Sequence, residues 1–240
     1  MTHIDISGNL AWQRLIKADE EIAMYRRTVV AIETGLAAGI AATNEGSTER
    51  EIAMAVAPAL IAAGCDTPLV GVIASGERLG QVHGGLSDRR LQRGDLVRLE
   101  MSNAINRYWA RIMRMLSIGP PDPESLALYE ELRALQDGQL AMLMPGAIPH
   151  DLDLFVRGRL PERVRAMQLS GYAMAFHERS VIGSDADRYT IRLNEVQPVE
   201  AGMVLHMYLT VANVSISETV LVTPDGCERL TTYPRDFVVR

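Results

Sequence analysis

The feature that most constrains the fold is an order of elements that occurs twice along the chain. Helical patterns cover residues 18–43 and 46–64, and short apolar runs separated by Gly and charged turns follow from 68 to 118. The same order returns in the second half, where the run EAGMVLHMYL echoes the earlier RGDLVRLEMS. This weak duplication predicts an α+β domain whose two pseudo-symmetric halves surround a central cleft, located where two sheets meet.

Local signals define where several of these helices begin and end. Thr48 and Glu51 have the spacing of a capping box, Gly64 is a stop signal, and Pro58 is expected to kink the helix between them. Asp122 precedes Pro123 at the start of a third helical stretch, and a fourth is expected over 151–167. Strand patterns resume at residue 169.

The composition excludes several classes of partner and site. With 24 Lys and Arg against 30 Asp and Glu, the net charge is −6, and no basic run predicts contact with nucleic acid or an anionic membrane. The start lacks secretory features and no window is apolar enough to span a bilayer, so we expect a cytoplasmic protein. Cys65 and Cys227 have neither disulfide nor zinc spacing.

Several stretches resemble one family, the pita-bread proteins that include methionine aminopeptidase, prolidase and creatinase. The matching stretches are IKADEEIAMYRR, LQRGDLVRLE, NRYWARIMRM, LSGYAMAFHERSVIG, AGMVLHMYL and SISETVLVTPDGCERLT. The resemblance begins at about residue 12 and keeps the internal spacings. It implies a single pita-bread domain over 13–240 with a junction segment at 1–12, and a homodimer.

The chain departs from the family at the positions that hold two divalent metals in its metallopeptidases. The resemblance places those ligands at Glu100, Arg111, Ser170, Tyr208 and Ser217. Arg has no lone pair to give and its positive charge repels a cation, so one carboxylate remains for two metals. We therefore expect no metal and no cofactor.

Side-chain alternation along the expected strands extends this group of residues. His206 shares a face with Tyr208, Trp109 shares one with Arg111, and Arg98 and Ser102 share one with Glu100. Arg111 is expected to neutralise Glu100 or to receive an anionic group of a ligand. The predicted substrate-binding residues are Glu100, Arg111, His206, Trp109 and Ser170.

The predicted catalytic residues are His83, His177 and Tyr208. The resemblance places His83 where creatinase has its proton-transferring His, and His177 in the family's His-Glu segment. These residues lead us to expect a metal-independent, creatinase-like enzyme acting on a C–N or similar polar bond of a small carboxylate-bearing substrate. Two alternatives stay open: a non-catalytic pita-bread binding module, and a lyase or isomerase that uses the same cleft.

Overall fold

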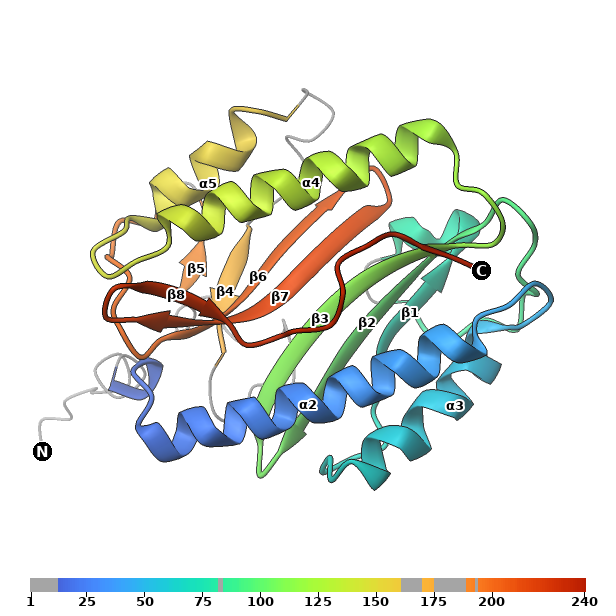
Figure 1. Cartoon of the computed structure of the whole chain (residues 1–240), viewed down its shortest axis with the longest axis horizontal. Helices are drawn as coiled ribbons and strands as arrows, with labels where there is room; N and C mark the ends of the chain where they lie inside the picture. The colour runs from blue at the N-terminus through green and yellow to red at the C-terminus, as the bar shows by residue number, and fades with distance from the viewer. Residues whose placement is uncertain (1–12, 82–83, 161–169, 175–188, 193) are drawn as a thin grey trace, which may run out of the picture.

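The computed structural model describes residues 13–81, 84–160, 170–174, 189–192 and 194–240 (Figure 1). Helices alternate with groups of antiparallel strands, as the sequence predicts. The helical elements are α2 (Asp19–Ala42), α3 (Glu49–Ala62), the short 3-10 turn η1 (Gly76–Gly80), α4 (Pro123–Met142) and α5 (Pro149–Arg157). The strands are β1 (Gly71–Ser75), β2 (Leu96–Ile105), β3 (Tyr108–Ser117), β4 (Gly171–Ala173), β5 (Thr190–Ile191), β6 (Val204–Val211), β7 (Val214–Thr223), β8 (Gly226–Arg229) and β9 (Val238–Val239).

The strands form one mixed sheet rather than the two sheets that we expected. Its order is β1-β2-β3-β7-β6-β4-β5, with β8 beside β7 and β9 beside β3. The hairpins β2-β3 and β6-β7 meet at the centre, where Met113 is opposite Ser217. The halves join because each contributes a long strand, β3 or β7, to this central pair.

The two central hairpins turn in the same way, which confirms the internal duplication. Asn106 and Arg107 connect β2 to β3 with positive φ angles of 50° and 69°. Ala212 and Asn213 connect β6 to β7 with φ angles of 44° and 72°. Two consecutive left-handed residues are typical of the tight turn whose twist matches that of the flanking strands.

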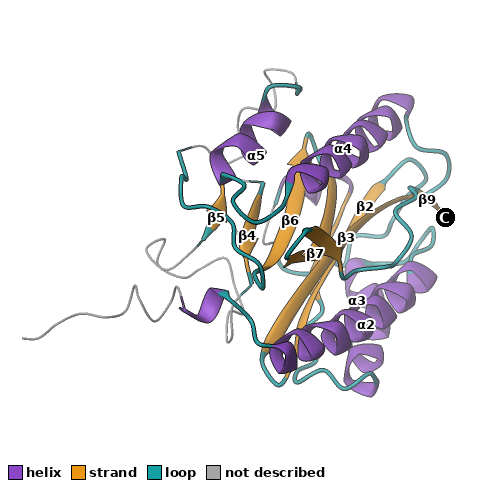
Figure 2. Cartoon of the chain, turned by 60° about the vertical axis from the view of Figure 1, so that its left-hand side comes forward, coloured by secondary structure: helices purple, strands orange, loops and turns teal. Residues whose placement is uncertain are grey.

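The long helices cover one face of the sheet (Figures 1 and 2). In the first half, α2 and α3 pack on Leu99 and Ile112, and Gly39 of α2 lies close enough to Leu99 that a Cβ would approach its side chain within 3.2 Å. In the second half, α4 packs through Leu132 on Leu209 and neighbouring residues. Alternation then directs the intervening side chains to the opposite face.

The predicted capping signals are confirmed. The Thr48 hydroxyl accepts from the Glu51 amide, and the Glu51 carboxylate accepts from the Thr48 amide at 2.9 Å. Asp122 likewise caps α4 by accepting from the Ser125 amide at 2.9 Å. The fourth helix is shorter than expected, because α5 ends at Arg157; residues 161–167 of the predicted helix lie outside the described residues, as does the 1–12 junction.

Two further observations concern membrane and thiol chemistry. Among the described residues, no helix combines the length and the apolar composition needed to span a bilayer.

Cys65 and Cys227 are free thiols, and burial raises the pKa of Cys65 to about 11. A thiol with so high a pKa carries little thiolate near neutrality and is a weak nucleophile.

Candidate functional site

Strand register brings the sequence-predicted residues together on the face of the sheet turned away from α2 and α4. Glu100 of β2 pairs with Met113 of β3, Met113 with Ser217 of β7, and Ser217 with Tyr208 of β6. The adjacent row pairs Ser102 with Arg111 and His206 with Thr219. We call this surface, defined by Arg98, Glu100, Ser102, Arg111, His206, Tyr208 and Ser217, the site face.

Arg111 and Glu100 form a buried ion pair at the centre of the site face. Arg111 Nη1 donates to Glu100 Oε1 at 2.9 Å, and both side chains are less than one-tenth exposed. The backbone of Arg111 is fixed by Thr219, whose hydroxyl accepts from the Arg111 amide at 2.9 Å and donates to the Arg111 carbonyl at 2.7 Å. The expected neutralisation of Glu100 by Arg111 is confirmed.

His206 lies on the same face and is almost fully buried. Its ring stacks on that of Tyr208, with 5.2 Å between the centroids and 21° between the planes. Desolvation first, and then the charge of Arg111, hold the pKa of His206 well below its usual 6.5. The imidazole is therefore neutral at physiological pH, because burial and the charge of Arg111 both disfavour its protonated form.

Several polar atoms with no partner among the described residues accompany these groups. Arg98 Nε and the hydroxyls of Ser102 and Ser217 are buried and form no hydrogen bond with any described residue. Burial lowers the pKa of Arg98, and the negative charge of Glu100 opposes that effect. Alternation had placed Arg98 on this face, although it was not among the predicted substrate-binding residues.

Two predicted residues have other contacts. Gln139 of α4 donates through Nε2 to the Ser170 hydroxyl at 2.9 Å and to the Leu152 carbonyl at 3.1 Å, so the hydroxyl of Ser170 is held by a helix. Trp109 is buried in the apolar cluster that contains Ile105. The structure thus brings together Glu100, Arg111, His206 and Tyr208. His83 and His177 lie outside the described residues.

The residues present do not fit a pair of divalent metals. Two cations need several carboxylate or imidazole donors that converge on them. The described part of the chain contains no group of three or more His, Cys, Asp or Glu side chains so arranged. At the centre of the site face, the one carboxylate is bound by the Arg111 guanidinium instead. The described part of the site face therefore does not form a two-metal centre.

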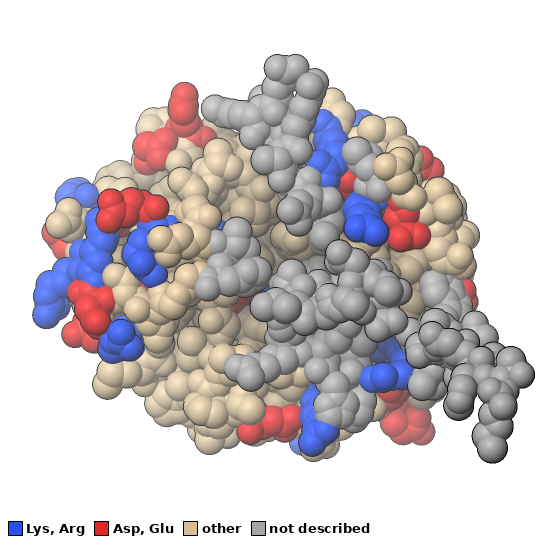
Figure 3. All heavy atoms as spheres, turned by 180° about the vertical axis from the view of Figure 1, so that it is seen from behind, with Lys and Arg blue, Asp and Glu red and all other residues tan. Residues whose placement is uncertain are grey.

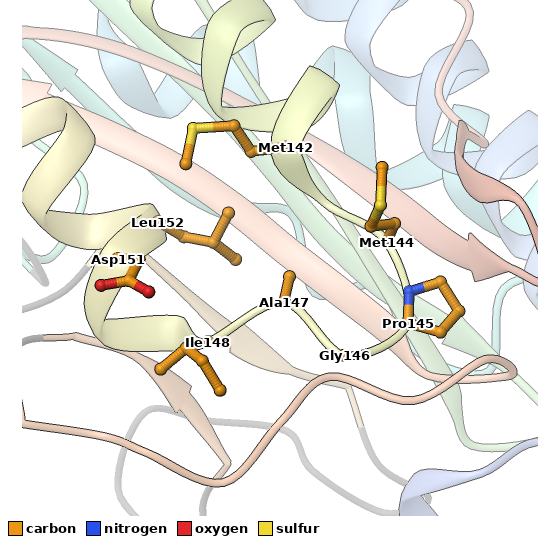
Figure 4. Close-up of a pocket in the computed structure, with 8 residues that line it drawn as sticks. All are labelled: Met142, Met144, Pro145, Gly146, Ala147, Ile148, Asp151 and Leu152. Carbon is orange, nitrogen blue, oxygen red and sulfur yellow. The ribbon is translucent and has the colours of Figure 1, made fainter.

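A separate pocket lies between the end of α4 and the start of α5 (Figure 4). Its volume is about 400 Å³, and none of the predicted site residues lines it. The lining residues are Met142, Met144, Pro145, Gly146, Ala147, Ile148, Asp151 and Leu152. In the view from behind, acidic and basic side chains intermix around the edge of the molecule (Figure 3), so no single sign dominates the described surface visible there.

Comparison with known proteins decides the family. The sequence pattern of metallopeptidase family M24 matches residues 23–224. The chain belongs to this family. An M24 relative, the Xaa-Pro dipeptidase of Pyrococcus furiosus, is 29% identical over 232 residues, which cover 94% of this chain and 65% of the relative. The putative dipeptidase YkvY of Bacillus subtilis is 27% identical over 94% of this chain and 63% of its own.

Solved structures confirm the pita-bread fold of the M24 family. The prolidase from Pyrococcus furiosus superimposes with a TM-score of 0.83 at 27% identity, covering 95% of this chain and 68% of that one. Dipeptidase PepE from Mycobacterium ulcerans gives a TM-score of 0.86 at 24% identity, over 98% of this chain and 64% of that one. The chain spans about 65% of the length of its M24 dipeptidase relatives.

These relatives overturn the expected function. We expected a metal-independent, creatinase-like enzyme acting on a small carboxylate-bearing molecule, and this prediction is wrong, because the relatives are Xaa-Pro dipeptidases and prolidases. They support neither the binding module nor the lyase or isomerase. The prediction relied on a few substituted ligand positions, whereas the similarity to M24 peptidases extends over 94% of the chain.

Proposed function

We propose that this domain is a peptidase-class member of M24 that acts on short peptides, with Xaa-Pro dipeptides as its substrate class. The observation that carries the proposal is the match over residues 23–224, together with the names of the relatives. The peptide is expected to bind on the site face, because strand register gathers the polar residues there in adjacent rows at the centre of the sheet.

The described residues offer groups that can bind and orient such a peptide. A short peptide carries an ammonium group at one end and a carboxylate at the other, and the site face offers Glu100 for the first and guanidinium groups for the second. Arg111 holds the Glu100 carboxylate in a fixed orientation through their 2.9 Å contact. Fixed complementary charges reduce the entropic cost of aligning the ligand.

The same face carries a neutral imidazole that can position the attacking water. Hydrolysis of an amide needs a base for the attacking water and a proton for the leaving nitrogen. Burial and Arg111 lower the pKa of His206, so its neutral imidazole is a weak base that can orient the attacking water as a hydrogen-bond acceptor, and its stacking on Tyr208 fixes the ring. The proton-transfer roles of His83 and His177 stay predictions. The homodimer and the cytoplasmic location also stay predictions.

The test is direct hydrolysis by the purified chain. Ala-Pro and Ala-Ala are incubated with it, once with excess chelator and once with Mn²⁺, and released amino acids are separated by chromatography. We expect release of proline in at least one arm, and at least a tenfold slower release from Glu100→Gln. The matched control is Glu228→Gln, whose carboxylate pairs with Arg26 on the surface. Absence of release in both arms overturns the proposal.

A further inference from the structure

One buried charge on the site face takes no part in the central ion pair. Arg98 is 2% exposed and forms no ion pair with a described residue. Its one hydrogen bond within the described residues is a long contact of 3.4 Å from Nη2 to the Gln81 carbonyl, and its Nε makes none. Glu100 lies near enough to influence Arg98 electrostatically, but Oε1 of Glu100 accepts its hydrogen bond from Arg111.

The other buried arginines differ from Arg98 in this respect. Arg111 pairs with Glu100, and Arg114 pairs with Glu218 at 3.1 Å. Burying a charge without an ionic partner is costly, because water is removed and little replaces it. The guanidinium of Arg98, which has no ionic partner among the described residues, is therefore suited to bind an anion supplied by a ligand.

The chemistry of the site face identifies the class of anion. Two guanidinium groups, those of Arg98 and Arg111, face the single carboxylate of Glu100, which leaves one excess positive charge. One charge matches a monoanion such as a carboxylate, and a guanidinium presents parallel N–H groups that fit its two oxygens. The unpartnered hydroxyls of Ser102 and Ser217 offer further hydrogen bonds to neutral polar atoms of the same ligand.

The spacing of the charges fits a peptide of two residues. Arg98 and Glu100 are two residues apart on one face of β2, a separation of about 7 Å along an extended strand. The termini of an extended dipeptide are also about 7 Å apart. A carboxylate at Arg98 therefore places the amino end of the peptide near Glu100.

We propose that Arg98 is the specificity residue that binds the C-terminal carboxylate of the peptide, in an orientation that directs the peptide's amino end toward Glu100. The proposal rests on the proposed function for the identity of the ligand. Carboxylate binding is measured without turnover, so the assignment of Arg98 and the proposed peptidase function can fail separately.

The test compares a carboxylate with its uncharged amide. Binding of L-proline and of L-prolinamide is measured by calorimetry for the wild type, for Arg98→Met and for the matched control Arg93→Met, which removes an exposed guanidinium just before β2. We expect the wild type and Arg93→Met to prefer proline at least tenfold. In Arg98→Met, proline should bind about tenfold more weakly, which abolishes the preference.

Three results would overturn the proposal: equal binding of proline and prolinamide by the wild type, binding of neither, or a preference that survives in Arg98→Met. Hydrolysis of Ala-Pro alongside any of them would leave the proposed function standing. Conversely, a proline preference that depends on Arg98, in a protein that releases no amino acid from Ala-Pro, would support the carboxylate site and overturn the peptidase.

Stability separates ligand binding from a structural role. Methionine fills a similar volume to the aliphatic part of arginine and carries no charge to desolvate. Arg98→Met is therefore expected to unfold at the same urea concentration as the wild type or at a higher one. A clearly lower midpoint would mean that Arg98 holds the fold together, and would overturn its assignment to a ligand.

Discussion

Two buried arginines on opposite faces of the central sheet show how differently one fold can use the same side chain. Arg114 of β3 lies on the helix face, where it pairs with Glu218 and donates to the carbonyls of Met113, Ser217, Tyr233 and Pro234 at 2.7–3.0 Å. Arg98 of β2 lies on the site face with one long contact. The first is saturated by protein groups, whereas the second keeps its hydrogen-bonding capacity for a ligand.

Arg114 and its hydrogen-bond partners also hold the C-terminal segment in place on the sheet. Tyr233 and Pro234 belong to the C-terminal segment, which crosses the helix side of the sheet between α2 and α4 before β9 pairs with β3 (Figure 1). Arg235 of this segment adds a contact of 3.2 Å to Glu218 and donates to Gln136 Oε1 at 2.9 Å. Charges on the helix face therefore join distant segments, which is a structural task.

Replacing Arg114 by Met should have the largest effect on stability. It leaves Glu218 buried without its main partner and removes the donor to four carbonyls, so the free energy of unfolding should fall by about 3–5 kcal/mol. Urea denaturation followed by circular dichroism measures this. Arg26→Met, which breaks a surface pair with Glu228, should change it little. Equal losses in the two variants would contradict the structural role of Arg114.

Glu100→Gln should have a smaller effect, because the site-face pair has fewer protein contacts. The amide keeps the shape of the carboxylate and loses the charge that faces Arg111, so we expect a loss of about 1.5–3 kcal/mol in the same denaturation experiment. A loss as large as that of Arg114→Met would mean that both faces serve stability equally.

The two faces should also respond to pH with opposite signs. On the site face, folding lowers the pKa of His206 below 6.5, so the unfolded chain binds a proton there that the folded chain does not. The free energy of unfolding should therefore fall as the pH drops below about 6.5, by at most about 1.4 kcal/mol per pH unit. Denaturation at several pH values should show this component in the wild type and lack it in His206→Gln.

On the helix face, Glu218 provides the opposite slope. Burial raises its pKa in spite of Arg114, so the folded chain retains a proton that the unfolded chain releases as the pH rises above about 4.3. Its contribution to stability should therefore decrease with rising pH across that window, and Glu218→Gln should remove this decrease. Two slopes of the same sign would show that one of the two pKa directions is wrong.

The smallest effect is expected when both partners on the site face are replaced together. Arg111→Met combined with Glu100→Leu removes two desolvated charges and substitutes apolar groups of similar size, so stability should stay within about 1 kcal/mol of the wild type. Arg114→Met combined with Glu218→Leu should remain destabilised, because the backbone carbonyls around Arg114 still lack a donor. Similar results for the two double variants would erase the contrast between the faces.

Much of this architecture was predictable because its signals are local. The capping box at Thr48 and the Asp122 cap depend on residues within one helical turn, and both were predicted. Strand alternation depends on a period of two, and it placed His206 with Tyr208 and Arg98 with Glu100 on common faces. Similar motif spacing likewise indicated the pita-bread fold.

Other properties depended on strands that are far apart in sequence. The sequence predicted two sheets, but the pairing of Met113 with Ser217 joins the halves into one. The hydrogen bond from Gln139 of α4 to the Ser170 hydroxyl also joins residues that are far apart in sequence, so local patterns could not predict it.

The sequence by itself therefore determined the helices, the hairpins, the fold family and the faces on which charged residues lie, because these follow from local periodicity and motif spacing. Only the tertiary structure decided that Arg114 is paired and saturated whereas Arg98 is not. Arg98 and Arg114 are both arginines in apolar strands, and nothing local distinguishes them. The difference arises because the C-terminal segment brings carbonyls to Arg114, while no described carboxylate pairs with Arg98.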